Sequence, residues 1–206
     1  IQQATGRMYI NDVGSDFFEE INEGFVTELN PAALRNYGWP VTEGVFDAST
    51  FPDFRNPVHA YGRGGSAGEC AVTGGAFYNP SNVVNFPSSY TGRYFFADVC
   101  AGWIRTIDPL TKSVEEFATG IEHAVDLTVG PDGALYYLGR EFNGSEAGAV
   151  FKITAVSNAP SITAGPESVT VRAGTPATLS VSATGAGTLT YRWQRNGTNI
   201  PGATSR

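Results

Sequence analysis

The chain has 206 residues, of which 41% are hydrophobic, 12% aromatic and only 16% charged, with 25 glycines and 12 prolines. This mixture favours short strands joined by tight turns over helices, which are rich in Ala, Leu, Glu and Lys. The net charge of −7 argues against a nucleic-acid partner, because phosphate binding requires a basic face. No apolar run approaches the ~20 residues that a membrane-spanning helix needs.

The acidity belongs to the first part of the chain. Four arginines against one glutamate give the segment from Ala159 onward a net charge of +3, so the first 158 residues carry −10. This charge is consistent with cation binding or simply with solubility. The opening IQQATGRMYI runs directly into a strand pattern, so we expect a piece of a longer protein with further domains upstream and downstream.

Three segments share one pattern, a Gly followed by an apolar strand rich in aromatic residues. They are GRMYINDV (6–13), GRYFFADV (92–99) and GALYYLGR (133–140), and their starts are separated by 86 and 41 residues. The longer interval is close to twice the shorter one. A unit of about 40 residues made of short antiparallel strands is typical of a propeller blade.

Turn sequences fit the same organisation. DPLT at 108–111 and GPDG at 130–133 each place a Pro between two apolar segments, and GAVFKI at 148–153 reads as a last strand. A propeller needs at least about four blades to close a ring, and the chain offers three or four. The sequence therefore predicts an incomplete ring.

The composition changes at 155–160, where AVSNAP reads as a linker. Alternating segments at 168–174, 177–183 and 190–197 then predict half-buried strands. Trp193 resembles the core Trp of an immunoglobulin-like sandwich, without the paired cysteines of antibody domains. We therefore expect an all-β chain, with the C-terminal blades of a six-bladed propeller at 1–155 and the start of an immunoglobulin-like domain at 156–206.

Six motifs between residues 6 and 153 carry a family resemblance. In chain order they are GRMYINDVGSDFFEEIN, NYGWPVTEG, NPVHAY, CAVTGGAFYNP, FPSSYTGRYFFADVCAGWI and VDLTVGPDGALYYL. This stretch resembles the glucose/sorbosone dehydrogenase family, which are soluble propellers that use pyrroloquinoline quinone (PQQ) and Ca²⁺. Non-enzymatic relatives, including the hedgehog-interacting proteins, share the pattern, so the fold does not decide the activity.

The resemblance implies a Ca²⁺ site. In the family the ligands are an acidic side chain matched by Glu20, a backbone carbonyl matched by Tyr37, and an acidic residue matched by Asp47. Ca²⁺ takes six to eight hard oxygens, so this set is chemically reasonable. The loop between Glu20 and Tyr37 is longer here than in the family. The alternative is that Glu19 and Glu20 are solvated loop acids, and Asp12 reads as a turn former.

The resemblance also locates a cofactor site. The family holds its anionic quinone with cations, but the matching positions here are His123 and Val125, and Tyr78 and Asn79 stand where some members have a Lys. His123 is the candidate cofactor contact, with a structural role as the alternative. The general-base His of the family belongs to an early blade, which this chain does not contain.

Cys70 and Cys100 flank two neighbouring predicted strands. Two cysteines in a turn-rich, exported domain indicate one disulfide, and family members have Cys at both positions. Two buried free thiols are the alternative. Together with the family resemblance, this pair predicts an extracellular or periplasmic protein.

Besides a structural role, in which the propeller is only a rigid part of a cell-surface assembly, two functions remain open at this stage. The first is a secreted PQQ-dependent sugar dehydrogenase-like protein that oxidises an aldose, with the quinone as hydride acceptor. The second is a non-catalytic, Ca²⁺-stabilised propeller that binds carbohydrate or protein, in keeping with an attached immunoglobulin-like domain. A sugar or polysaccharide is the expected partner in the first case and a possible one in the second.

Overall fold

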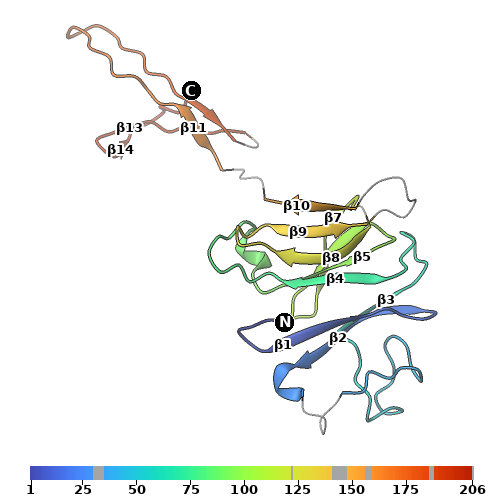
Figure 1. The fold of residues 1–206 in the computed structure, drawn as a ribbon. Helices are drawn as coiled ribbons and strands as arrows, with labels where there is room; N and C mark the ends of the chain where they lie inside the picture. The colour runs from blue at the N-terminus through green and yellow to red at the C-terminus, as the bar shows by residue number, and fades with distance from the viewer. Residues whose placement is uncertain (30–34, 122, 141–147, 156–158, 186–187, 206) are drawn as a thin grey trace. The chain divides into compact units, whose positions relative to one another are not determined.

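The computed structural model describes residues 1–29, 35–121, 123–140, 148–155, 159–185 and 188–205. The chain divides into two compact units, Ile1–Ala155 and Val156–Arg206. Apart from the 3-10 helices Val26–Glu28 (η1) and Ser88–Tyr90 (η3), the regular structure of the described residues consists of strands (Figure 1). The all-β prediction is therefore confirmed. Among the described residues, no helix is long and apolar enough to cross a membrane.

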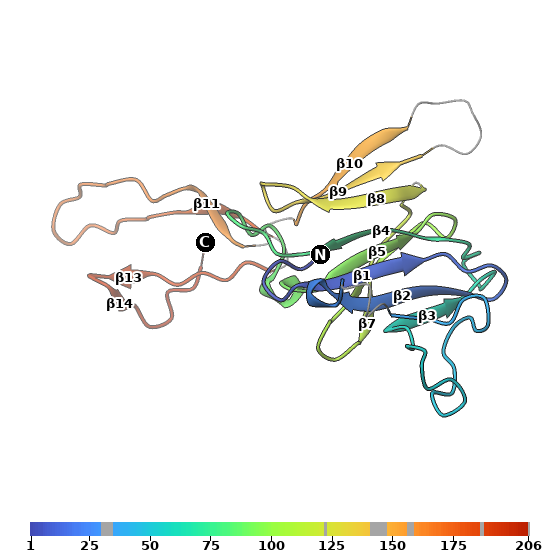
Figure 2. The ribbon, with the colours of Figure 1, turned by 60° about the horizontal axis from the view of Figure 1, so that its bottom comes forward.

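Three small antiparallel sheets make up the described part of the first unit (Figures 1 and 2). In chain order their strands are β1 (Arg7–Asp12), β2 (Phe18–Phe25) and β3 (His59–Gly62); β4 (Val72–Phe77), β5 (Tyr94–Asp98), β6 (Trp103–Ile107) and β7 (Val114–Thr119); and β8 (Ala124–Val129), β9 (Leu135–Gly139) and β10 (Ala149–Ile153). Strand β4 packs against both β8 and β1. The arrangement is consistent with part of a propeller, and no sheet closes into a ring within the described residues.

Each of the three repeated sequence segments contains one strand. GRMYINDV contains β1, GRYFFADV contains β5 and GALYYLGR contains β9. The two predicted Pro-containing turns join β6 to β7 and β8 to β9. These predictions succeed because they rest on local signals, a Gly or Pro turn next to an apolar strand.

The central sheet is covered on both faces. All five residues of β5 are buried, and the first four alternate between two hydrophobic cores. Phe95 and Ala97 belong to the core shared with the β8–β10 sheet, whereas Tyr94 and Phe96 belong to the core shared with the β1–β3 sheet. A strand buried on both faces needs apolar residues at every position, which explains why YFFA shows no alternation.

A buried carboxylate joins the ends of several strands. Asp98, at the end of β5, is 0% exposed and accepts the Tyr61 hydroxyl of β3 at 3.0 Å. It also accepts four backbone N–H groups, those of Cys70, Ala71, Cys100 and Ala101. The structure contains the Cys70–Cys100 disulfide that the sequence predicted, with Cα atoms 5.6 Å apart. Asp98 therefore binds the backbone on both sides of the Cys70–Cys100 disulfide.

The second unit contains four short strands in its described residues. They form two antiparallel pairs, β11 (Ser161–Ala164) with β12 (Ser182–Thr184), and β13 (Gln194–Arg195) with β14 (Thr198–Asn199). The strand predicted at 168–174 is wrong, because no described segment pairs with it, and Val169 and Val171 are exposed. The predicted core Trp193 is only half-buried, and its indole N–H donates to the Ser205 carbonyl at 2.9 Å.

Replacement of Asp98 by Asn is expected to destabilise the first unit by about 2–3 kcal/mol, because an amide cannot accept five donors and turns two of its own toward them. Urea unfolding measures this change. Asp108→Asn is the matched control, since Asp108 also accepts backbone N–H groups after a strand but lies at an exposed turn. Its expected cost is below about 1 kcal/mol. Equal effects of the two substitutions would contradict the assigned role of Asp98.

Candidate functional site

Strand β2 carries two adjacent glutamates, and both are buried. Glu19 is 0% and Glu20 6% exposed, in a run of buried residues that continues through Ile21 and Asn22. The interpretation of Glu19 and Glu20 as solvated loop acids is therefore wrong. Because successive side chains of a strand point to opposite faces, the two carboxylates enter different surroundings.

Glu19 is paired with a cation. Its carboxylate forms an ion pair with Arg63 and accepts the backbone N–H of Val72, at the start of β4, at 2.9 Å. Burial raises the pKa of Glu19 on balance, while the Val72 N–H and the Arg63 guanidinium lower it and so compensate part of the charge. Glu19 therefore links the first sheet to the second, and its role is structural.

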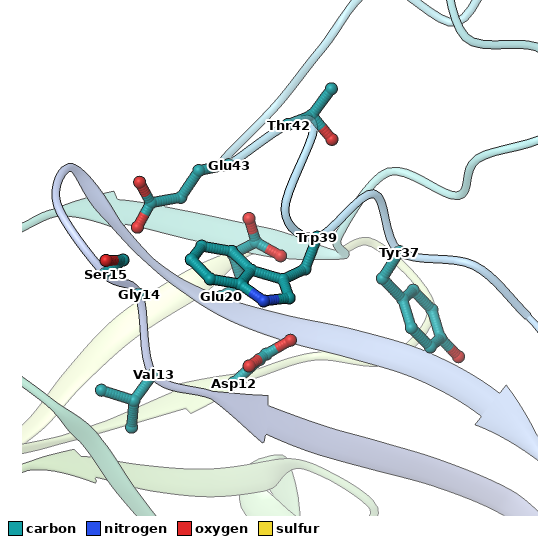
Figure 3. Close-up of a pocket in the computed structure, with 9 residues that line it drawn as sticks. All are labelled: Asp12, Val13, Gly14, Ser15, Glu20, Tyr37, Trp39, Thr42 and Glu43. Atoms are coloured by element: carbon teal, nitrogen blue, oxygen red, sulfur yellow. The ribbon is translucent and has the colours of Figure 1, made fainter.

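Glu20 instead faces a pocket of about 260 Å³ (Figure 3). The pocket is lined by Asp12, Val13, Gly14, Ser15, Glu20, Tyr37, Trp39, Thr42 and Glu43. Glu20 accepts the backbone N–H of Gly44 and, at 3.4 Å, a hydrogen bond from the Asn22 amide. Burial raises the pKa of Glu20, and the nearby carboxylates of Asp12 and Glu43 raise it further. Among these lining residues there is no Lys or Arg, so the Gly44 N–H and the Asn22 amide, which lower the pKa, offset the negative charge only in part.

Two further carboxylates reach this pocket. Asp12 ends β1 directly opposite Glu20 in the β1–β2 pairing. Glu43 accepts the backbone N–H groups of Asp16 at 3.2 Å and Phe17 at 3.1 Å, in the loop between β1 and β2. Burial would raise the pKa of Glu43, but its backbone hydrogen bonds outweigh burial and lower it. The anionic Glu43 carboxylate therefore holds the loop between β1 and β2 in place.

Of the three Ca²⁺ ligands that the resemblance implied, two line this pocket. Tyr37 does so with Glu20, and its hydroxyl donates to the Glu23 carbonyl at 3.0 Å. Asp47 is exposed and does not line the pocket. Its carboxylate accepts the backbone N–H of Ser49 at 2.8 Å, and this bond lowers the pKa of Asp47. The structure thus brings Glu20 and Tyr37 together and leaves Asp47 in a turn of its own.

Sequence reasoning missed Asp12, Thr42 and Glu43 as pocket residues. Asp12 was detectable, because a short loop between two adjacent strands places residue 12 opposite residue 20 in a hairpin. Glu43 carried no such signal, since it contacts backbone 26 and 27 residues earlier in the chain. Thr42 adds a hydroxyl oxygen that is buried without a hydrogen-bond partner.

His123, directly before β8, is not among the residues that line the acidic pocket. Its Nδ1 is 2.8 Å from the Val99 carbonyl, and its backbone has a φ of +33°. Tyr78, at another position matched to a quinone contact, is 0% exposed and donates its hydroxyl to the Gly133 carbonyl at 2.9 Å. With Val125 apolar, none of these three side chains is the guanidinium or ammonium group that would hold an anionic quinone with a fixed charge.

No family model matches the sequence, and no curated protein matches it. Among solved structures, a glucose dehydrogenase aligns with a TM-score of 0.52 at 18% identity, over 72% of this chain and 41% of that one. The soluble aldose sugar dehydrogenase from Escherichia coli, in the apo-form, aligns with a TM-score of 0.50 at 23% identity, over 70% and 40%. The chain has part of their fold.

A third structure, the PQQ-bound form of aldose sugar dehydrogenase from Streptomyces coelicolor, aligns with a TM-score of 0.48 at 18% identity, over 70% of this chain and 39% of that one. The chain thus spans about two fifths of the length of these sugar dehydrogenases. A fold shared at such identities does not establish a shared reaction, so the chemistry has to be argued from the site.

Replacement of Glu20 by Gln tests whether the buried negative charge of Glu20 destabilises the folded chain. Because burial raises the folded-state pKa of Glu20, the ionised carboxylate disfavours folding above that pKa. In a chelating buffer near pH 7, E20Q is expected to be at least as stable as the parent. The difference should shrink as the pH falls below the folded-state pKa of Glu20 and vanish below the ordinary Glu pKa of about 4.3, where the carboxyl is protonated in both states. Urea unfolding at the two pH values measures this.

The neighbouring substitution Glu19→Gln is the control. It leaves the Arg63 guanidinium without its carboxylate, so it is expected to destabilise the chain near pH 7. An E20Q protein that is less stable than the parent near pH 7 in chelator would show that Glu20 already has a favourable environment without a cation.

Proposed function

We propose that the chain is the C-terminal part of the propeller of an exported, sugar dehydrogenase-like protein, followed by the start of an immunoglobulin-like domain. The observation that supports this most directly is the set of three small antiparallel sheets, which has part of the fold of two sugar dehydrogenases. The six ordered motifs and the Cys70–Cys100 disulfide agree with it. Further propeller strands precede this part in the proposed protein.

The acidic pocket is the proposed Ca²⁺ site. Its donors are hard oxygens, the class that Ca²⁺ prefers, and the described lining residues provide no competing cation. The buried Thr42 hydroxyl oxygen, which has no partner, also fits such an ion. Glu20 would hold it, with Tyr37 and Asp12 beside it. Asp47 remains a proposed ligand from the resemblance, although its carboxylate is engaged with Ser49.

For the complete protein, the first candidate activity is oxidation of an aldose with PQQ as hydride acceptor. The residues of this chain at the matched positions do not fit the quinone, since His123, Val125 and Tyr78 provide no guanidinium or ammonium group. His123 remains the proposed contact, through its ring rather than through a fixed charge. Any cationic grip on the quinone therefore has to come from elsewhere in the complete protein.

One observation favours the second candidate, a non-catalytic module that binds carbohydrate. Trp39 lines the acidic pocket and is 63% exposed (Figure 3). An exposed aromatic ring packs against the C–H face of a sugar, and neighbouring carboxylates accept its hydroxyl hydrogens. Such a site binds a sugar without any redox cofactor.

Addition of Ca²⁺ is expected to stabilise the parent chain against unfolding by about 2.7 kcal/mol at a concentration one hundred times its Kd. E20Q should lose this stabilisation, because the site loses a carboxylate. Asp47→Asn decides whether Asp47 belongs to the site: a ligand role predicts a weaker Ca²⁺ effect, and a turn role predicts an unchanged one. Calorimetric melting in Ca²⁺ and in Mg²⁺ measures this stabilisation in the parent, E20Q and Asp47→Asn proteins. Equal stabilisation of parent and E20Q by Ca²⁺ would place the ion elsewhere.

Titration of the complete protein with PQQ in Ca²⁺ buffer tests the activity. Stoichiometric binding, followed by bleaching of the quinone absorbance when an aldose is added, is the result expected for a dehydrogenase. No binding well above the micromolar range, together with calorimetric binding of an oligosaccharide that Trp39→Ala abolishes, would establish the carbohydrate-binding module instead.

A further inference from the structure

Arg63, directly after β3, binds the polypeptide between Gly14 and Glu19 at three points. Its guanidinium donates to the Gly14 carbonyl at 2.7 Å and forms the ion pair with Glu19. Its backbone N–H donates to the Phe17 carbonyl at 2.9 Å. Arg63 does not line the acidic pocket, whereas Gly14 does. A cation outside the pocket is therefore fixed to one of its walls.

Glu43 binds the complementary backbone groups of the same segment, residues 14–17. Its carboxylate accepts the N–H groups of Asp16 at 3.2 Å and of Phe17 at 3.1 Å. Arg63 thus takes carbonyl oxygens of the 14–17 segment, and Glu43 takes its N–H groups. Hydrogen bonds to charged groups are stronger than those between neutral groups, so these two side chains together fix the position of the segment.

The 14–17 segment lies so close to Glu43 that only Gly fits at position 14. A Cβ on Gly14 would overlap Glu43 Oε1 and the Phe18 carbonyl oxygen. In Figure 3 the Glu43 carboxylate points toward Gly14. The segment therefore has no room to move toward Glu43, and the hydrogen bond from Arg63 restrains it through the Gly14 carbonyl.

The position of the segment also determines the surroundings of Glu20. Glu43 is followed by Gly44, whose N–H donates to the Glu20 carboxylate. Gly44 lies against the Phe18 ring, since a Cβ on Gly44 would overlap that ring. Residues 12–15 supply four of the nine residues that line the pocket. A displacement of the segment would therefore change both the wall of the pocket and a donor that partly offsets the charge of Glu20.

Repulsion between like charges acts against this arrangement. Asp12, Glu20 and Glu43 all line the pocket, and the carboxylates of Asp12 and Glu43 raise the pKa of Glu20. Without a bound cation, three neighbouring carboxylates repel one another and favour a wider spacing. The contacts of Arg63 to the 14–17 segment oppose such a widening, because they hold the wall that carries Asp12 from outside the pocket.

We propose that Arg63 is a positioning residue of the acidic pocket. It holds the 14–17 segment, and with it the wall that carries Asp12, at the spacing in which the pocket receives a cation. The cation is the Ca²⁺ of the proposed function, on which this part of the assignment rests, whereas the restraint of the segment needs no ion. Because Ca²⁺ affinity depends on the arrangement and rigidity of the ligands, a pocket whose wall is held in advance binds the ion more tightly.

Arg63→Gln tests the restraint of the segment. In a chelating buffer, the amides of Asp16 and Phe17 are expected to exchange with solvent at least about tenfold faster than in the parent, relative to the amides of the buried strand β5, which report global unfolding. Glu19→Gln is the matched control, because it removes the same ion pair but leaves Arg63 within reach of the Gly14 carbonyl. Its relative effect on the two amides should be below about threefold.

Hydrogen exchange followed by NMR gives these rates residue by residue. Equal relative rates in the parent and in Arg63→Gln would overturn the proposal. If Arg63→Gln does not fold, Arg63→Lys replaces it, since an ammonium group keeps the charge but lacks the two-pronged guanidinium that reaches both Gly14 and Glu19. Arg63→Lys should then show faster relative exchange at Asp16 and Phe17, and parent rates would overturn the proposal.

Calorimetric titration of the folded proteins with Ca²⁺ tests the consequence for the pocket. Arg63→Gln is expected to weaken Ca²⁺ binding by about tenfold or more, and Glu19→Gln by less than about threefold. Both variants lose the ion pair, so a merely structural role of Arg63 predicts equal affinities, and equal affinities would overturn the proposal. A parent that binds no Ca²⁺ would contradict the proposed function and the ligand assigned here, while faster exchange in Arg63→Gln would still support the restraint of the segment.

Discussion

The first unit depends on one buried carboxylate. Asp98 is fully enclosed, and its two oxygens accept the Tyr61 hydroxyl and the backbone N–H groups on both sides of the disulfide. An anion without solvent is tolerated only where donors surround it, and here they come from β3, from the approach to β4 and from the turn before β6. This corner therefore sets how the first sheet meets the second, and with it the place of Glu19 and Glu20.

Glu19 and Glu20 show how strongly the surroundings of a side chain differ between adjacent residues of a strand. Glu19 points toward Arg63 and the start of β4, where its charge is partly compensated. Glu20 points to the opposite face, where Asp12 and Glu43 add negative charge and the described lining has no cation. Glu19 contributes to the fold, whereas Glu20 has a charge that two hydrogen bonds offset only in part and that a cation or a proton would neutralise.

Local patterns were sufficient for the strands and insufficient for the site. Gly6, Gly92 and Gly133 mark the starts of the three repeated strands in the sequence. Each has a positive φ, which favours Gly, and an apolar strand follows each. Glu43 and Thr42 reach the pocket through contacts distant in sequence, which no periodicity encodes. In the second unit, the alternation of apolar residues at Val169 and Val171 predicted a strand that does not form, because a strand forms only where another strand pairs with it.

The three tryptophans occupy contrasting environments. Trp103 is 3% exposed and stacks with the Arg105 guanidinium 3.9 Å from its ring, whereas Trp39 is 63% exposed at the pocket. Trp193 belongs to the other unit. An exposed indole emits at longer wavelength than an enclosed one and is reached by dissolved quenchers. Within the first unit, quenching of Trp39 emission therefore follows events at the acidic pocket, while the emission of Trp103 follows the integrity of the core; the half-buried Trp193 adds a separate signal from the second unit.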